Sequence, residues 1–535
     1  MKKILKSLNI IKRAPLYKRA FLGLTVVTVL SASGCSSFLD KEPTFVVKDN
    51  YYTNENDVNI GLTGIYSVLG NEDFYGSSLP YHLSMSDEGV WQRSNALTGP
   101  EVYIYDSSNQ LVRNLWKYLY EGVERANVFL SKVDAAKMDE AKKTIAKGEA
   151  KFLRAYYYFV LTSNFGGVPL KKVPTYSVND VNTPKASLND LYSFITSEME
   201  EAEGMVQPIT AYGHSGRVTK SAVRGILARV YLKMAGAPLN GGRPYYEKAA
   251  EWAGKLVNPV NGDYQHKLVG DYKQLFKDMA AESVFNIDES IWEVEFAGNR
   301  STDFEAGRHG NIAGIQFTSE TIDSLGYSYG FILATRKLYE HYGANDTDQR
   351  RDWNIAPYAY NNTTGVSSAR PELDNRFSAK FRRNYETLKP RHKNYTPINF
   401  PLLRFSDVLL MYAEAKNELD DVNEAGLKVK MVRDRAHAID STSAIGGDKD
   451  MMRQFIRNER FRELAFEGLR KFDLVRWNIL ENTMHGLASD IEANTPTARK
   501  YTAFGPKNVS SRNVLLPIPL DELSLNKAMS QNQGW

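Results

Sequence analysis

The stretch from Gly148 to Leu170 constrains the fold of this chain more than any other. Its apolar and aromatic residues recur every three or four positions, which places them on one face of a helix: Phe152, Ala155, Tyr156 and Phe159. A second row widens this face, so the helix must be covered on most sides: Leu153, Tyr157, Val160 and Leu161. Gly166 and Gly167 are expected to end the helix, and Pro169 prevents its continuation. The sequence therefore predicts a central helix whose three consecutive tyrosines, 156–158, are better explained as core than as a surface that stacks on a ligand.

The order of the other predicted helices indicates a repeat of helical pairs. The chain has 535 residues, too many for one simple core. Apolar periodicity predicts helices over 57–69, 116–133, 148–165, 189–203, 219–236, 245–256, 406–418, 424–437, 452–466 and 468–477. Helices of this length joined by short turns resemble tetratricopeptide-type pairs. We therefore expect a mainly α fold built from tetratricopeptide-like helical pairs.

A region of different character separates the two helical blocks. Residues 258–400 are rich in Gly, Asn, Ser, Thr and Tyr and contain strand-like pieces such as Ile291–Phe296. Binding residues often lie in irregular segments that a rigid scaffold positions. We predict an N-terminal helical-repeat part over 57–257, an irregular ligand-binding part with short strands over 258–400, and a C-terminal helical part over 401–535 that closes the same body.

The N-terminus has the features of an export signal. Residues 1–34 combine basic side chains with an apolar run from Ala20 to Leu30 that is too short to be a permanent membrane span. Cys35, the only cysteine, follows small residues, as in a bacterial lipobox, although Ala32 stands where a lipobox usually has Leu. The alternative is ordinary cleavage near Gly34 that leaves a free thiol. We expect a lipid attached at Cys35, a tether over 35–56, and a mature body that is soluble but held at the membrane by its acyl chains.

The charge of the mature chain argues against nucleic acid as a ligand. The net charge of +4 includes seven basic residues and no acidic residue in 1–34. Without that segment, the chain keeps 60 of its 67 basic residues and all 63 acidic residues, which gives a net charge of −3. Proteins that bind nucleic acid usually carry a basic surface.

Recognisable catalytic and metal-binding motifs are absent from the sequence. It contains no Gly-x-Ser-x-Gly, no phosphate-binding loop and no His-x-x-x-His pair, so a zinc site is not expected and no cofactor is predicted. The acid-rich segment 345–352 lacks the Gly and final Glu of a calcium-binding loop, which favours an ion-paired turn. A pair of carboxylates for glycoside hydrolysis remains open, because their separation is a spatial property. An enzyme is therefore the less favoured interpretation.

The charge-dense segment 456–467 has two interpretations, a polyanion site or structural ion pairs. Its basic and acidic residues are spaced three or four apart, as in Arg460 with Glu463 and Arg462 with Glu459. Mixed signs favour structural ion pairs.

Several blocks together resemble the SusD/RagB family of nutrient-capturing surface lipoproteins of Bacteroidetes. The blocks are residues 35–43, residues 148–159 with 165–169, residues 403–415, residues 459–470 with 473–477, and residues 516–519 with the C-terminal 531–535. Gln533 departs from the family, which usually has Pro there. The resemblance implies a body of tetratricopeptide-like pairs, a place at the cell outer membrane, and a partner, a TonB-dependent barrel of the SusC type that the lipoprotein caps. These blocks are scaffold, and the ligand-binding residues of the family vary, so none is carried over.

Physical chemistry must therefore suggest the binding residues. Sugar rings pack their C–H faces on aromatic side chains, while their hydroxyls need fixed polar partners. Trp91 is the leading candidate, in a polar loop with Asp87 and Arg93; the alternative is that Trp91 is tucked into the body. Weaker candidates lie in the irregular part: Phe317, Tyr327 and Tyr329. Trp292 and Trp477 are expected in the core.

Three functional hypotheses follow. The favoured one is non-catalytic binding of oligo- or polysaccharide and its delivery to a SusC-like transporter. The second keeps this scaffold but binds peptides or another nutrient. The third is a surface glycoside hydrolase.

Overall fold

The computed structural model describes residues 52–535, apart from 96, 178–180, 261, 282–283, 300–304, 344–346 and 440–445. The predicted signal peptide over 1–34 and the predicted lipid-attachment residue Cys35 lie outside the described residues, as does most of the predicted tether. Residues Tyr52–Trp535 form one compact unit.

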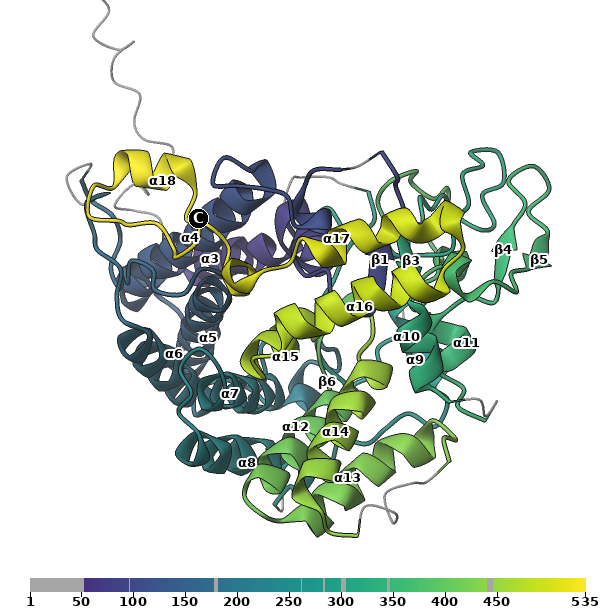
Figure 1. Cartoon of the computed structure of the whole chain (residues 1–535). Coiled ribbons are helices and arrows are strands. Elements are labelled where there is room, and N and C mark those ends of the chain that lie inside the picture. Colours follow the sequence, from purple (N-terminus) through teal and green to yellow (C-terminus); the bar gives the residue numbers. More distant parts are fainter. Residues whose placement is uncertain are drawn as a thin grey trace, which may run out of the picture. The chain divides into compact units, whose positions relative to one another are not determined.

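Helices make up most of the described elements and pack as consecutive pairs (Figure 1). The N-terminal block contains α3 (Glu55–Ser67), α4 (Gln110–Lys132), α5 (Glu140–Phe165), α6 (Leu188–Glu203), α7 (Lys220–Ala235) and α8 (Arg243–Val257). The C-terminal block contains α12 (Phe405–Glu418), α13 (Val422–Arg435), α14 (Lys449–Glu463), α15 (Arg470–Arg476), α16 (Leu480–Asn494), α17 (Phe504–Lys507) and α18 (Leu520–Leu525). Helices α4 and α5, α5 and α6, α7 and α8, and α12 and α13 pack against each other, and α12 also contacts α8. The predicted mainly α fold of helical pairs is confirmed.

The region between the two blocks carries short helices and strands, as its composition predicts. The helices are α9 (Tyr272–Ala280), α10 (Arg336–His341) and α11 (Arg351–Asn354). The strands of the described chain are β1 (Gly89–Trp91), β2 (Ser290–Val294), β3 (Ile332–Ala334), β4 (Tyr358–Tyr360), β5 (Ser367–Ala369) and β6 (Phe400–Arg404). They form three antiparallel pairs: β1 with β3, β2 with β6 and β4 with β5. The pairing of β2 with β6 ties the middle region to α12, which begins directly after β6.

The C-terminal half of helix α5 is completely enclosed. Every residue from Phe152 to Phe165 is buried, and the three tyrosines at 156–158 are at most 1% exposed. Trp292 of β2 packs its ring against Phe152 at 5.2 Å and Tyr156 at 4.8 Å between ring centroids. The helix begins at Glu140, before its apolar face does, because the Asp139 side chain caps the first turn by accepting the amide of Lys142. Its tyrosines and Trp292 are core, as predicted.

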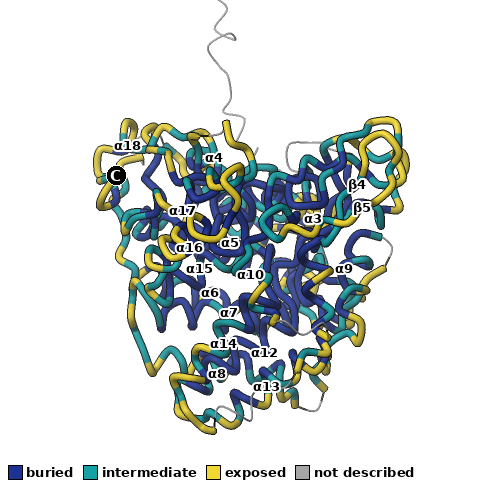
Figure 2. Tube along the Cα trace, turned by 45° about the vertical axis from the view of Figure 1, so that its right-hand side comes forward, coloured by how far each residue is buried: buried dark blue, intermediate teal, exposed yellow. Residues whose placement is uncertain are grey.

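Burial falls off toward the outer elements (Figure 2). The β4–β5 hairpin is only partly covered, and all three residues of β5 are exposed. Trp477 is half-buried against the core, and its indole nitrogen donates to Glu414 Oε1 at 2.9 Å. It is therefore a boundary residue rather than an enclosed one.

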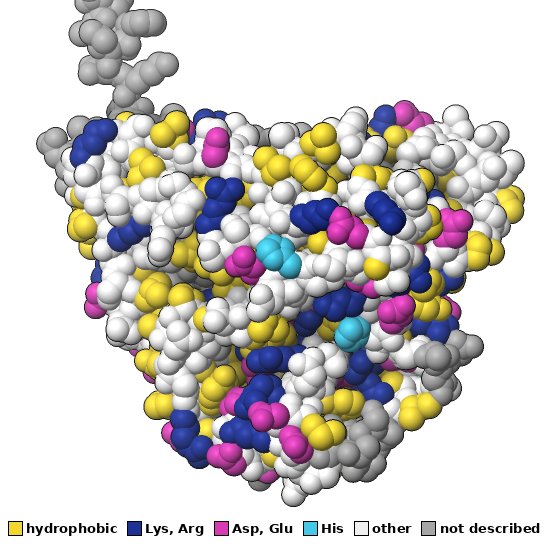
Figure 3. Space-filling view, viewed as in Figure 1, with side chains coloured by type: hydrophobic (Ala, Val, Ile, Leu, Met, Phe, Trp, Pro, Cys, Tyr) yellow, Lys and Arg dark blue, Asp and Glu magenta, His cyan; other side chains and the backbone are white. Residues whose placement is uncertain are grey.

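The charge-dense segment 456–467 forms structural ion pairs, but with partners other than most of those predicted. Arg462 does pair with Glu459, at 2.8 Å. Arg460 pairs with Asp407 at 2.7 Å and Asp473 at 2.8 Å, not with Glu463. Arg460 differs from the prediction for a geometric reason. Its side of α14 is buried against other elements, so the carboxylates of Asp407 and Asp473 lie closer to its guanidinium than the carboxylate of Glu463 does. On the molecular surface, Figure 3 shows basic and acidic side chains interspersed rather than gathered by sign.

Candidate functional site

Four aromatic side chains form a continuous row, called here the aromatic strip: Tyr327, Tyr329, Phe331 and Trp91. Ring centroids of Tyr327 and Tyr329 are 5.0 Å apart, and those of Tyr329 and Phe331 are 4.9 Å apart with the planes at 19°. The Trp91 ring lies 5.0 Å from Phe331 and completes the row. The structure thus brings together three residues that the sequence singled out: Trp91, Tyr327 and Tyr329.

The strip follows from the backbone that carries it. Gly330 has φ 57°, which is not an extended conformation, so the ring of Phe331 is placed by its contacts with Tyr329 and Trp91. Side chains alternate sides where the chain is extended at Ser328, so Tyr327 and Tyr329 share one side. Between them, Ser328 faces inward and is buried, and its backbone exchanges two hydrogen bonds with Phe317, at 2.9 and 2.7 Å. Trp91 reaches the strip because β1 pairs with β3, which places it opposite Ile332. Two short strands therefore align rings that are far apart in the chain.

Amide side chains beneath the strip fix its backbone. Asn311 Nδ2 donates to the carbonyl of Tyr327 at 3.1 Å, and Gln316 Nε2 donates to that of Tyr329 at 3.1 Å. Gln92 Nε2 donates to the carbonyl of Gly330. A row of rings on a backbone held in this way is preorganised, which lowers the entropic cost of binding a ligand.

Polar and cationic groups border the strip. The exposed Arg93 guanidinium lies over the Phe331 ring, 4.2 Å from its centroid, and the exposed Lys393 ammonium lies 5.0 Å from the centroid of Tyr327. Tyr329 donates its hydroxyl to Asn394 Oδ1 at 3.2 Å. Partial burial raises the pKa of Tyr327, so its phenol stays a neutral donor and acceptor near pH 7.

The strip is accessible along most of its length. Tyr327, Tyr329 and Phe331 are half-buried, so each ring offers one part to solvent. Trp91 is 9% exposed and packs on its other side against His82, whose ring centroid is 5.2 Å away. Trp91 therefore supports the end of the strip and presents little surface of its own. Flat apolar faces bordered by donors and acceptors are suited to a ligand with both C–H faces and hydroxyls.

The structure places two other predicted residues away from solvent. Asp87 has no exposed surface, and its carboxylate accepts two hydrogen bonds from Arg470, at 2.8 and 3.0 Å, and one from Lys337 at 3.0 Å. Burial alone would raise the pKa of Asp87, but the two cations lower it to about 2. Phe317 is 1% exposed and packs against Tyr360. Neither side chain can reach a ligand in this structure, because each is held in the interior.

Sequence reasoning missed three members or neighbours of the strip: Phe331, Lys393 and Asn394. The signal for Phe331 was present, because the run Tyr-Ser-Tyr-Gly-Phe at 327–331 continues the alternation already visible at Tyr327 and Tyr329. Lys393 and Asn394 carry no local signal, since only the tertiary structure brings that loop to the strip.

The described part of the acid-rich segment near 345–352 is ion-paired, as predicted. Asp348 binds Arg350 at 2.7 Å, and Asp352 binds Arg351 at 3.0 Å. Within the described residues, His, Asp and Glu side chains do not gather in groups of three that could hold a metal ion. Nor does any helix of the described chain combine the length and apolar character of a membrane span.

Two family models match this chain. The model described as the SusD family matches residues 288–535. A second, described as "Starch-binding associating with outer membrane", matches residues 37–232. The segment 327–331 of the strip and the three C-terminal blocks therefore lie inside the first match, and Trp91 and α5 lie inside the second.

Individual relatives cover nearly the whole chain. A SusD-like protein from Formosa agariphila is 26% identical and covers 95% of this chain and 97% of its own length. The crystal structure of a SusD homologue from Bacteroides thetaiotaomicron is 25% identical, with a TM-score of 0.82 over 92% of this chain and 99% of that one. A laminarin-binding SusD-like protein of known structure is 24% identical, with a TM-score of 0.68 over 90% of this chain and 100% of that one.

Proposed function

The chain belongs to the SusD family, and from this premise we propose that it binds oligo- or polysaccharide at the cell surface without cleaving it and passes it to a SusC-like TonB-dependent barrel. The observation that carries the glycan part is the aromatic strip. Three of its four rings, those of Tyr327, Tyr329 and Phe331, are partly exposed, and the row is bordered by Arg93, Lys393 and Asn394. Two comparisons support the same ligand class: a matching family model is described as starch-binding, and one similar structure binds laminarin.

In this proposal each part of the strip has its own role. Tyr329 lies at its centre, where its ring is stacked with Phe331 and its hydroxyl bonds Asn394. Because Tyr329 and Phe331 stack on each other and Arg93 lies over Phe331, a pyranose would pack against the exposed edges of these two rings, with its hydroxyls near the guanidinium of Arg93 and the amide of Asn394. Trp91 fixes the position of Phe331 from behind. Specificity would then come from these polar groups, and affinity from the rings.

The test is isothermal titration calorimetry of the mature protein with starch and laminarin oligosaccharides, comparing Tyr329→Ala with the unaltered chain. Truncating a central aromatic contact costs about 2 kcal/mol or more, so binding should weaken by roughly 30-fold. Tyr176→Ala is the matched control, because Tyr176 is 76% exposed and lies outside the strip. That variant should bind as the unaltered chain does.

Three results would contradict the proposal. Equal affinities of the Tyr329→Ala and Tyr176→Ala variants would remove the strip from the binding site. Binding of peptides in the absence of binding to any glycan would favour the alternative nutrient class. Release of reducing sugar from a bound glycan by the purified protein would show a hydrolase.

The membrane location and the partner are tested separately. We propose that Cys35 carries the lipid, and Cys35→Ala should move the protein from the outer-membrane fraction to the soluble fraction. Purification of the unaltered protein from detergent-solubilised outer membranes should recover a TonB-dependent barrel. Recovery of the protein alone, under conditions that preserve known barrel complexes, would contradict the partnership.

A further inference from the structure

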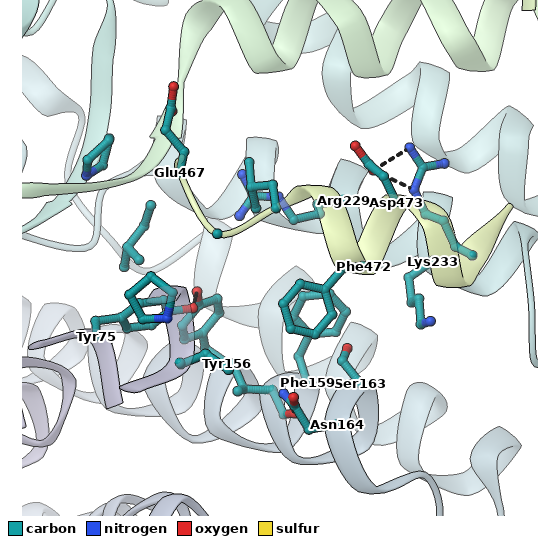
Figure 4. Close-up of a pocket in the computed structure, with 18 of the residues that line it drawn as sticks. Tyr75, Tyr156, Phe159, Ser163, Asn164, Arg229, Lys233, Glu467, Phe472 and Asp473 are labelled. Atoms are coloured by element: carbon teal, nitrogen blue, oxygen red, sulfur yellow. Dashed lines mark hydrogen bonds and ion pairs between the residues drawn. The ribbon is translucent and has the colours of Figure 1, made fainter. Parts of the chain in front are cut away.

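A pocket of about 80 Å³ lies against α5, on the helix face that carries Tyr156, Phe159 and Val160 (Figure 4). Helix α7 contributes Leu232 and Lys233 to it, and α15 contributes Phe472. Figure 4 shows Phe159 and Phe472 in the middle of the pocket, Tyr75 and Tyr156 toward one end and Lys233 toward the other. A single water needs about 10–15 Å³ of such space, so the pocket has room for a small organic molecule.

The pocket has an entrance. Gly468, Leu469 and Phe472 are only half-buried, whereas Tyr156 and Val160, which lie deeper on α5, are buried. A ligand would therefore enter past α15 and come to rest against α5. The lining shares no residue with the aromatic strip, so the pocket is a separate site.

The charged groups around the pocket are paired, with one exception. Arg229 binds Asp407 at 2.6 Å, and Asp473 binds Arg460 and Arg476, each at 2.8 Å. The remaining anion of the lining, Glu467, binds Lys380 and Arg404, at 2.6 and 2.7 Å. These groups therefore leave no carboxylate available to the pocket.

Lys233 is the exception. It is 5% exposed, and its ammonium donates to the backbone carbonyl of Ala237 at 3.0 Å. Among the described residues, no carboxylate lies within 4.0 Å of that ammonium, although Lys233 is buried. Burial, assisted by the nearby Arg476, lowers the pKa of Lys233 to about 7, and Asp473 opposes this shift. A buried ammonium without a carboxylate partner is unfavourable, because no opposite charge offsets its loss of hydration. A ligand carboxylate that reached it would supply that charge.

We propose that this pocket binds a small apolar carboxylate, with its ring or chain between Phe159 and Phe472 and its carboxylate on the Lys233 ammonium. The lining supplies the apolar contacts, and among the described cations of this lining Lys233 is the one without a carboxylate within 4.0 Å, since Arg229, Arg460 and Arg476 are paired. A bound carboxylate would keep the amine protonated and share it with the Ala237 carbonyl. The proposal does not depend on the glycan site.

The test uses benzoate and its neutral isostere benzamide as probes of the full mature protein, with binding followed by ligand-observed NMR. Benzoate should bind at least tenfold more tightly than benzamide. Lys233→Met keeps the apolar stem and removes the charge, so the difference between the two probes should fall to within about twofold. Lys248→Met is the matched control, because Lys248 lies on α8 and is exposed beside Glu251, and it should preserve the tenfold preference.

A second measurement tests the ion pair directly. In protein labelled with ¹³C at the lysine ε-carbons, saturating benzoate should raise the titration midpoint of the Lys233 signal by at least one pH unit. An unchanged midpoint, absence of saturable benzoate binding up to ~10 mM, or equal benzoate affinity in the Lys233→Met variant would each overturn the proposal.

Discussion

At the scale of single residues, the strongest restraints are charges that have no access to water. Glu463 is fully buried and accepts from Arg350 at 3.0 Å, Arg404 at 3.0 Å and Arg435 at 2.6 Å. Removing such charges from water costs several kcal/mol per ion, and only well-formed pairs offset that cost. The network therefore specifies one arrangement of the elements that contribute to it, even where its net contribution to stability is small.

Loss of the Glu463 charge should destabilise the protein strongly. Glu463→Gln leaves three buried guanidinium groups with one acceptor fewer, and we expect the free energy of unfolding to fall by about 3–5 kcal/mol. Urea denaturation followed by far-UV circular dichroism measures this change. Glu492→Gln is the control, since Glu492 is exposed and its pair with Lys507 should contribute less than ~1 kcal/mol. Similar losses in the two variants would contradict the assignment.

Glu459 should make the free energy of unfolding depend on pH at values below the usual pKa of a glutamate. Burial would raise its pKa, but Arg350, Arg462 and Arg433 lower it from 4.5 to about 2. The unfolded chain therefore binds the proton first as pH falls. The stabilisation, about 3 kcal/mol, is fully present above pH 4.5 and is lost as pH falls toward 2. Urea denaturation at a series of pH values should show this loss, and Glu459→Gln should flatten it; parallel curves for the two proteins would rule out Glu459 as the titrating group.

At the scale of elements, each end of α5 is set by a particular residue. Gly166 follows its last residue with φ 73° and ψ −131°, a backbone conformation that is essentially restricted to glycine. A Cβ there would also lie 2.9 Å from Leu515 Cδ1. The same glycine that predicts the end of the helix is thus required by both the backbone and its packing.

Gly166→Ala should destabilise the protein by about 1–3 kcal/mol, because alanine is strained in that backbone region. The matched control is Gly204→Ala at the end of α6, where φ is −71° and the nearest atom to a new Cβ is 3.7 Å away. We expect a change within about 0.5 kcal/mol there. Midpoints of urea denaturation compare the two variants, and an effect at Gly204 as large as at Gly166 would refute the conformational argument.

At the scale of the whole molecule, the described unit is held together by contacts between its sequence-distant parts. Strand β2 of the middle region pairs with β6, and Glu289 before β2 binds Arg404 at the end of β6 at 2.8 Å. A single hydrophobic cluster includes residues as far apart as Tyr81 and Val509. The N-terminal helices, the middle region and the C-terminal helices therefore share buried surface.

The unit Tyr52–Trp535 should accordingly unfold in one cooperative transition. Differential scanning calorimetry should give a calorimetric enthalpy equal to the van't Hoff enthalpy, and circular dichroism and tryptophan fluorescence should report the same midpoint. Two resolved transitions would mean that the middle region or a helical block is an independent unit. A control scan at a second heating rate distinguishes a true equilibrium from irreversible loss.

The sequence by itself determined the positions of most helices, because apolar periodicity and helix-ending glycines are local signals. Thr219 before α7, Gly166 after α5 and the five-residue strand around Trp292 were all legible in this way. It also carried the family blocks and singled out Trp91, Tyr327 and Tyr329. Helix α16 is absent from the predicted helices although its buried residues keep helical spacing: Leu480, Met484, Leu487, Ala488 and Ile491.

Only the tertiary structure decided which of these residues meet. Asp87 looked like a ligand for a sugar hydroxyl, yet Arg470, 383 residues away, and Lys337, 250 residues away, pair with it in the interior. Trp91 packs against Phe331 because β1 pairs with β3. Lys393 lies over the ring of Tyr327 because of the path of a loop that has no recognisable sequence pattern. The physical reason is that helix formation depends on neighbours three and four residues apart, whereas burial, ion pairing and the surface of a binding site depend on topology.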